Sequence, residues 1–196
     1  MILKSIDATL VLVALAACAG PDAAPPPAVA PPEMHHAQGH GHGHGHGPAE
    51  ASSGDPKEKA LDQVAAIHGA AGPWAVAGYR MGDYALGKLG LARGSFDLEV
   101  SHHTPRAVKY SCIADGAAAA TGASAGKLNL LLVDADEAHV ETTYRRKSTG
   151  QSITLRPAAS FGARFADVPQ GQARVLGKQV LELPAGEVFE EVAAAK

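Results

Sequence analysis

The sequence predicts an α+β fold in which several helices pack with a small antiparallel or mixed sheet. Three observations lead to this prediction. Apolar residues recur at helical spacing in residues 56–68 and 72–91. They alternate in "SFDLEVSHHTP" and in "HVETTYRRKSTGQSITLRP". A change of composition near Asp55 confines these patterns to residues 55–196, a length typical of one domain.

The N-terminus "MILKSIDATLVLVALAACAG" has the organisation of an export signal. Lys4 precedes an apolar run of about ten residues, which is too short to span a bilayer but suits a signal peptide. The run ends in "LAAC", which resembles the lipobox of bacterial lipoproteins. The resemblance implies removal of residues 1–17, a lipid on Cys18 and export, with Ala19 favouring the outer membrane over retention at the inner one. An uncleaved anchor or a misassigned start is the alternative.

Residues 18–54 are rich in proline, alanine, glycine and histidine and contain few large apolar side chains. Such a chain cannot bury enough surface to offset its conformational entropy, so we expect a disordered linker. Six of its residues are histidines, several of them alternating with glycine: His35, His36, His40, His42, His44 and His46. Imidazole binds transition metals, and this spacing predicts several exchangeable sites suited to metal capture. An expression tag, or a solvated linker that meets metal only incidentally, is the alternative.

The domain opens with "DPKEKALDQVAAIHG". Asp55 can cap a helix whose first residue is Pro56, and Gly69 ends it just after His68. His68 at this end is a candidate metal ligand, although a histidine there can also serve only to bond the last carbonyls.

A second helix is expected over residues 72–91. Gly78 and Gly82 lie four residues apart on one helical face, which predicts that another backbone packs closely against them.

The remaining segments alternate between strands and helices. Phe96, Leu98 and Val100 should face inward from a strand that brings His102 and His103 to its end. Residues 111–121 read as a helix, "KLNLLLV" as a buried strand, and "HVETTYRRKSTGQSITLRP" as a hairpin. Two or three short helices should complete the chain.

The chain contains two cysteines, Cys18 and Cys112. If Cys18 is acylated, Cys112 has no partner for a disulfide within the chain. We expect Cys112 in the first turn of its helix, where the helix dipole lowers a thiol's pKa and favours a metal ligand or a nucleophile. A small buried core residue is the alternative.

Four stretches resemble the FmdE family, which takes its name from a component of formylmethanofuran dehydrogenase: "IHGAAGPWAVAGYRMGDYALGKLG", "SHHTPRAVKYSCIADGAAAATGASAGKLNL", "YRRKSTGQSITL" and "VLELPAGEVFEE". The likeness covers residues 68–191. It implies an α+β domain, often dimeric, with a metal near the opening histidine motif and the S-C motif. By position, His68 is the first histidine of the family's H-G-H opening, Cys112 its central cysteine, and Lys127 part of its G-K-x-N turn.

The chain departs from that family at Ala70, which stands where the second histidine of H-G-H is expected. His102 or His103 could supply a replacement ligand. Formylmethanofuran chemistry itself is not expected, because the sequence shows no molybdopterin or iron–sulfur ligand set and an exported lipoprotein is a poor place for that pathway.

Three functions remain open. The first is a cell-envelope lipoprotein that binds a transition metal through His68, Cys112, His103 and His102, for trafficking or buffering. Mixed thiolate and imidazole ligands favour zinc, with nickel, cobalt or copper as alternatives. A homodimer and a metal transporter or acceptor protein are further candidate partners, and the lipid is the expected link to the membrane.

The second function is an enzyme or a small-molecule-binding protein with a glycine-lined cleft. Cys112 would be its ligand or nucleophile, and the cleft candidates are Tyr79, Arg80, Asp115 and Lys127. The lack of any dyad or triad spacing argues against an enzyme. The third function is a partner-binding lipoprotein without a metal in its domain. The formal charge of −3 and the scarcity of aromatic residues give no sign of nucleic-acid binding.

Overall fold

The computed structural model describes residues 54–169 and 171–193. The expected signal peptide, Cys18 and the histidine tract lie outside these residues. Among the described residues, no helix combines the length and the apolar character that crossing a bilayer requires.

Five strands form one mixed sheet in the order β2-β1-β3-β4-β5. Their bounds are β1 Leu98–Thr104, β2 Leu130–Asp134, β3 Glu141–Arg146, β4 Ser152–Pro157 and β5 Phe189–Glu191. β1 pairs parallel with β2, and the other neighbours pair antiparallel. The parallel pair is possible because a helix crosses between its two strands. The structure confirms the α+β class and the β3–β4 hairpin.

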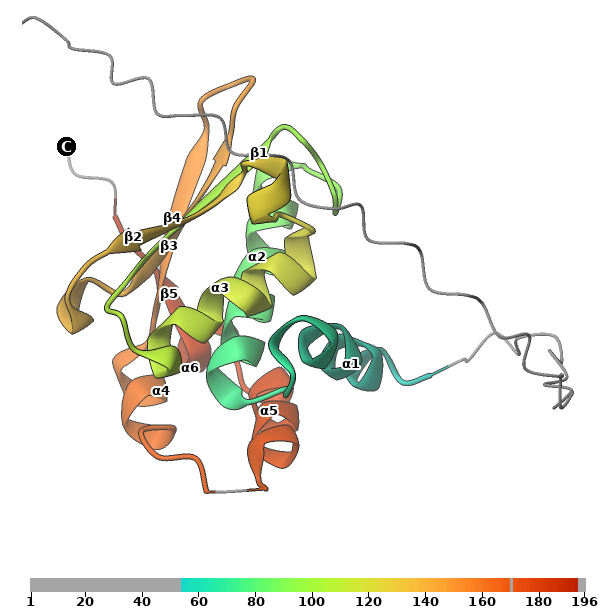
Figure 1. Cartoon of the computed structure of the whole chain (residues 1–196), viewed down its shortest axis with the longest axis vertical. Helices are drawn as coiled ribbons and strands as arrows, with labels where there is room; N and C mark the ends of the chain where they lie inside the picture. The colour runs from blue at the N-terminus through green and yellow to red at the C-terminus, as the bar shows by residue number, and fades with distance from the viewer. Residues whose placement is uncertain (1–53, 170, 194–196) are drawn as a thin grey trace, which may run out of the picture. The chain divides into compact units, whose positions relative to one another are not determined.

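The described residues also form six α-helices. They are α1 Pro56–His68, α2 Pro73–Leu89, α3 Val108–Thr121, α4 Ala159–Arg164, α5 Ala173–Glu182 and α6 Ala185–Val188, with 3₁₀ turns at Ala125–Lys127 and Glu137–His139. α2 and α3 contact the strands, α1 packs against both of these helices, and α5 packs against α2 and α1 (Figure 1). The core therefore lies between the sheet and the α2–α3 pair.

The two central helices cross at very close range, as the spacing of Gly78 and Gly82 predicts. A Cβ atom on Gly78 would overlap the carbonyl group of Ile113 in α3. A Cβ atom on Gly116 of α3 would overlap the carbonyl oxygen of Ala75 in α2. These glycines line a helix–helix contact, so the prediction of a glycine-lined cleft was wrong: α3 fills the space.

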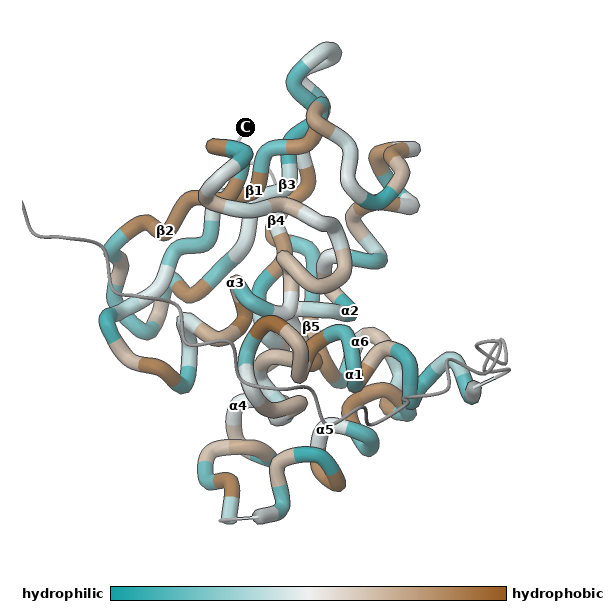
Figure 2. Tube along the Cα trace, turned by 45° about the vertical axis from the view of Figure 1, so that its right-hand side comes forward, coloured by the Kyte–Doolittle hydropathy of each residue, from teal (hydrophilic) through white to brown (hydrophobic). Residues whose placement is uncertain are grey.

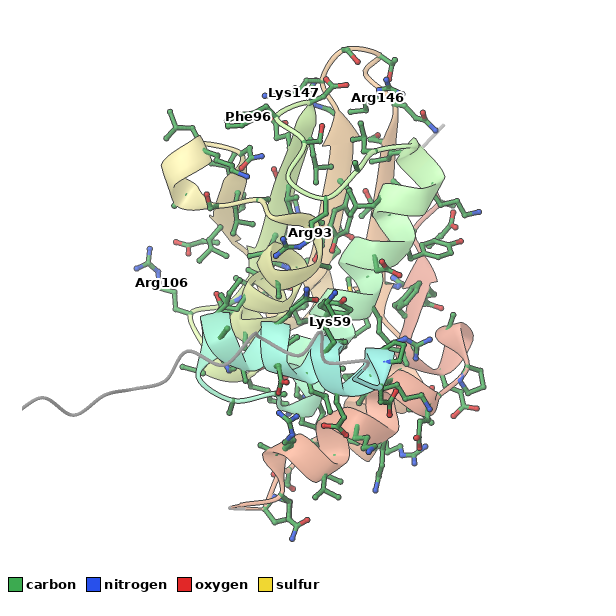
Figure 3. All side chains as sticks on the ribbon, turned by 90° about the vertical axis from the view of Figure 1, so that its right-hand side faces the viewer. Lys59, Arg93, Phe96, Arg106, Arg146 and Lys147 are labelled. Carbon is green, nitrogen blue, oxygen red and sulfur yellow. The ribbon has the colours of Figure 1, made fainter. Side chains whose placement is uncertain are left out.

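Two predictions about apolar strand residues were also wrong. Phe96 lies before β1 with 68% of its surface exposed, at the end of the domain that carries Arg146 and Lys147 (Figure 3). β2 is an edge strand whose residues Leu131 and Leu132 are exposed, and Figure 2 shows this hydrophobic segment at the rim of the domain. An apolar run indicates a strand but does not reveal whether a neighbour covers both of its sides.

Candidate functional site

A pocket of about 310 Å³ opens where the end of α1, the start of α2, the start of α3 and the segment after α4 meet. The groups that give it chemical character are His68, Trp74, Lys109, Cys112, Phe165 and Asp167. Most of its lining is apolar, so the few polar groups in it work in a partly dehydrated setting. The structure thus brings together two of the predicted metal ligands, His68 and Cys112.

His68 is held at this pocket by the way α1 ends. Asp55 caps the start of the helix by accepting a hydrogen bond from the backbone N–H of Lys57. Gly69 ends it in the left-handed conformation, with φ of 85°, which glycine adopts at little cost. The chain turns there and leaves His68 facing α3.

The ring of His68 is oriented by a carboxylate from α3. Its Nδ1 lies 2.8 Å from Oδ2 of Asp115. Because an ionised carboxylate only accepts hydrogen bonds, Nδ1 donates, and the lone pair of the neutral ring is then on Nε2. A carboxylate in this position is what orients many metal-binding histidines.

Cys112 lies one helical turn before Asp115 on α3, and only 7% of its surface is exposed. Its thiol donates to the carbonyl oxygen of Lys109 over 3.1 Å. Burial, together with the nearby carboxylate of Asp115, raises the pKa of Cys112 to about 12. The prediction of a lowered pKa was wrong for two reasons: α3 begins at Val108, which places Cys112 beyond the first turn, and burial outweighs the dipole.

The two adjacent histidines of β1 do not reach this pocket. His102 is fully buried, with Nδ1 2.9 Å from the hydroxyl of Thr142 and Nε2 3.1 Å from the carbonyl oxygen of Tyr110. Burial lowers its pKa to about 4, so the ring is neutral and both nitrogens are already bonded. His103 faces the opposite side of the strand, with Nδ1 3.7 Å from a carboxylate oxygen of Glu141.

The four cleft candidates do not converge either. Arg80 donates to the carbonyl oxygens of Val180 and Leu183 at the end of α5, each at 2.7 Å. Tyr79 donates to the side chain of Gln63, and Lys127 donates to the carbonyl oxygen of Gly122.

Asp115 contacts His68, and it is the cleft candidate that the structure connects to the pocket.

The pocket fits a transition metal only in part. His68 and Cys112 supply the imidazole and sulfur donors that zinc prefers, and Asp167 at the exposed rim adds a carboxylate. Ala70, which replaces the second family histidine, also lines this pocket and offers no side-chain donor. Within residues 54–169 and 171–193, no three His, Cys, Asp or Glu side chains converge as a metal would require.

A second pocket, of about 360 Å³, adjoins the first and shares Trp74 and Lys109 with it. The ammonium group of Lys109 stands 5.4 Å from the ring centre of Trp74 and 5.3 Å from that of Tyr110. Sequence reasoning missed Trp74, Lys109 and Phe165 as pocket residues. They come from three separate segments, and no local pattern indicates that these meet.

Fold and pocket together define an α+β domain with a histidine–cysteine pocket at the junction of its first three helices. The family model described as "FmdE, Molybdenum formylmethanofuran dehydrogenase operon" matches residues 67–190. The chain therefore belongs to the FmdE family, and the resemblance drawn from its motifs is confirmed. No curated protein matches the sequence.

Proposed function

We propose that this protein is a lipid-anchored protein of the cell envelope that binds a transition metal for trafficking or buffering. Zinc is the first candidate, and nickel, cobalt and copper are the alternatives. The observation that supports this proposal best is that His68 and Cys112 line one pocket, with Asp115 orienting the imidazole.

The proposed ligands have complementary chemistry. Nε2 of His68 can donate its lone pair without losing a proton, whereas Cys112 must lose one before it binds a metal. Because the pKa of Cys112 is raised, loss of its proton is costly in the absence of a cation. A divalent ion in the pocket would supply the positive charge that stabilises the thiolate.

The histidine tract and the lipobox give the proposal its cellular setting. Export would place the domain where metals enter the envelope, and Cys18 would carry the lipid that keeps it there. Histidines 35–46 would collect ions from solution, and the domain would hold one of them. A metal transporter or an acceptor protein would be the natural partner, and a homodimer is the assembly that the family resemblance suggests.

Elemental analysis of the mature chain after dialysis against zinc tests the domain site. We expect Cys112→Ser and His68→Gln each to lose about one ion per chain that the unmodified protein retains. Ser111→Ala and His139→Gln are the matched controls, because neither side chain lines the pocket; Ser111 is partly exposed and His139 is exposed. Equal metal content in all five proteins would refute the domain site.

A second candidate function is the binding of a small molecule with an apolar part. The two adjoining pockets, bridged by Lys109 above two aromatic rings, favour it. A nucleophilic role for Cys112 in such a protein would need a base, since its pKa of about 12 leaves it protonated at neutral pH. Thermal-shift screening of apo protein against zinc and a small-molecule library separates the two functions.

A further inference from the structure

We propose that the two adjoining pockets bind a small organic anion together with the metal. The carboxylate of this anion lies against Lys109 and supplies a ligand to the metal held by His68 and Cys112. Its apolar body lies in the second pocket, beside Trp74. This inference rests on the metal site proposed above and names the chemical class of the second ligand, a chelating monocarboxylate of low molecular mass.

The first argument is a shortage of donors in the first pocket. A structural zinc site takes four protein ligands, and a catalytic site takes three and keeps one position open. His68 and Cys112 line the pocket, with Asp167 at its exposed rim, while Ala70 offers no side-chain donor. No three His, Cys, Asp or Glu side chains in the described part of the chain are placed to hold a metal. An ion in this pocket therefore has coordination positions that an outside ligand can fill.

The second argument is the position of Lys109, which lines both pockets and is half-buried. Its ammonium group faces the rings of Trp74 and Tyr110, which attract the charge but do not neutralise it. Among the described residues, Lys109 forms no ion pair with a carboxylate. A ligand carboxylate at this junction gains a charge-assisted hydrogen bond, and it also separates the ammonium group from the metal ion, which Lys109 would otherwise repel.

The third argument concerns the charge of the ligand. The other charged side chains that line the second pocket have partners of their own. Glu137 accepts a hydrogen bond from the hydroxyl of Tyr110 over 2.9 Å, and Arg156 donates to Glu190 over 2.7 Å. The cation that remains for a ligand in this described lining is Lys109. A single cation matches one carboxylate better than a phosphate group, which carries more charge at neutral pH.

The fourth argument is the space beside Lys109. The second pocket has a volume of about 360 Å³, within the range of small-molecule sites. Trp74, Val140, Pro157 and Ala158 give it apolar walls. The indole N–H of Trp74 donates to the carbonyl oxygen of Phe165, so the ring is fixed and has no donor left for a ligand. This lining favours a ligand with an apolar body.

Picolinate and nicotinate are matched probes for this site. Both are pyridine monocarboxylates, but only picolinate has its ring nitrogen next to the carboxylate, where the two groups can chelate one ion. The full mature chain is loaded with less than one equivalent of Co²⁺, and each acid is added in turn. A thiolate-to-cobalt charge-transfer band reports the bond to Cys112, and the d–d bands report the coordination geometry.

We expect picolinate to change the d–d bands saturably while the thiolate band persists, because the acid and Cys112 then bind the same ion. Nicotinate should leave the d–d bands unchanged at the same concentrations. Lys109→Met should weaken picolinate binding at least about 10-fold, because it removes a charged hydrogen-bond donor. Lys109→Arg, which keeps the charge, should restore most of the affinity. Lys147→Met is the control, because this exposed residue lies outside both pockets (Figure 3).

Equal picolinate affinity in Lys109→Met and the unmodified protein would overturn the inference. Loss of the thiolate band on addition of picolinate would do the same, since the acid would then remove the metal instead of sharing it. Equal responses to the two acids, or d–d bands that neither acid changes, would show that the carboxylate is not a ligand of the metal. Absence of the thiolate band with and without picolinate would instead refute the domain metal site itself.

Discussion

Asp115 and His68 face each other across the junction of α3 and α1, with 2.8 Å between the carboxylate oxygen and Nδ1. This contact fixes which ring nitrogen is free to bind a ligand, and it ties the end of one helix to the motif that carries Cys112. The orientation of the His68 ring in the proposed metal pocket depends on this pair.

Asp115→Asn should therefore weaken metal binding without removing a ligand. The amide no longer carries the charge that supports Nδ1–H donation and the basicity of Nε2. Loss of such an orienting carboxylate typically lowers metal affinity about 10–100-fold. Competition with a chromophoric chelator measures the loss. Asp83→Asn on α2 is the control, and an unchanged affinity in Asp115→Asn would show that the pair is only structural.

Cys112 in the metal-free protein should react slowly with iodoacetamide. Thiolate is the reactive species, and a pKa of about 12 leaves very little of it at pH 8. With Cys18 replaced by serine, alkylation should be at least about 100-fold slower in the native protein than in denaturant. Mass spectrometry follows the reaction, and equal rates in the two states would contradict the burial of the thiol.

The lowered pKa of His102 should make the domain less stable in mild acid. Its pKa is about 4 in the folded protein against an ordinary value of 6.5, so between these pH values the unfolded chain binds more protons. Stability is therefore fully present above pH 6.5 and falls as the pH drops towards 4, by up to about 3 kcal/mol.

Urea denaturation at a series of pH values measures this loss. His102→Gln, whose amide can still bond Tyr110 and Thr142, should have a flatter profile between pH 6.5 and 4. If the stability of His102→Gln falls with pH as steeply as that of the unmodified protein, a group other than His102 causes the loss.

The α2–α3 contact should not tolerate a methyl group. Gly116→Ala places Cβ against the carbonyl of Ala75, and we expect a loss of about 1–3 kcal/mol in the free energy of unfolding. Gly87→Ala on the open side of α2, where no atom lies within 4 Å, should instead stabilise by about 0.5–1 kcal/mol. Thermal unfolding compares the two, and similar effects would contradict so close a packing.

The sequence predicted the fold to the extent that local patterns determine it. The cap at Asp55 and the glycine at position 69 bounded α1 correctly, and the spacing of Gly78 and Gly82 correctly indicated a close helix crossing. Leu131 and Phe96 were misplaced because exposure depends on whether another segment covers a residue. A single run of residues does not carry that information.

The candidate site was predictable where motifs mark it. His68 and Cys112 stand out in the sequence, and the structure places them in one pocket. His102 lies next to a strand end in the sequence, but its ring is taken up by Thr142 and by a backbone carbonyl. The hydrogen-bond partners of His102 can be identified only from the structure. The same holds for Trp74 and Phe165, which line one pocket although they are far apart in the sequence.

X-ray absorption spectroscopy of the zinc-loaded mature chain tests the central claim most directly. Because excess zinc could also occupy the histidine tract, the protein is loaded with less than one equivalent. The account predicts one sulfur neighbour at about 2.3 Å and at least one nitrogen neighbour at about 2.0 Å that shows imidazole scattering. A shell of nitrogen and oxygen without sulfur would contradict it and would place the metal outside the pocket of Cys112.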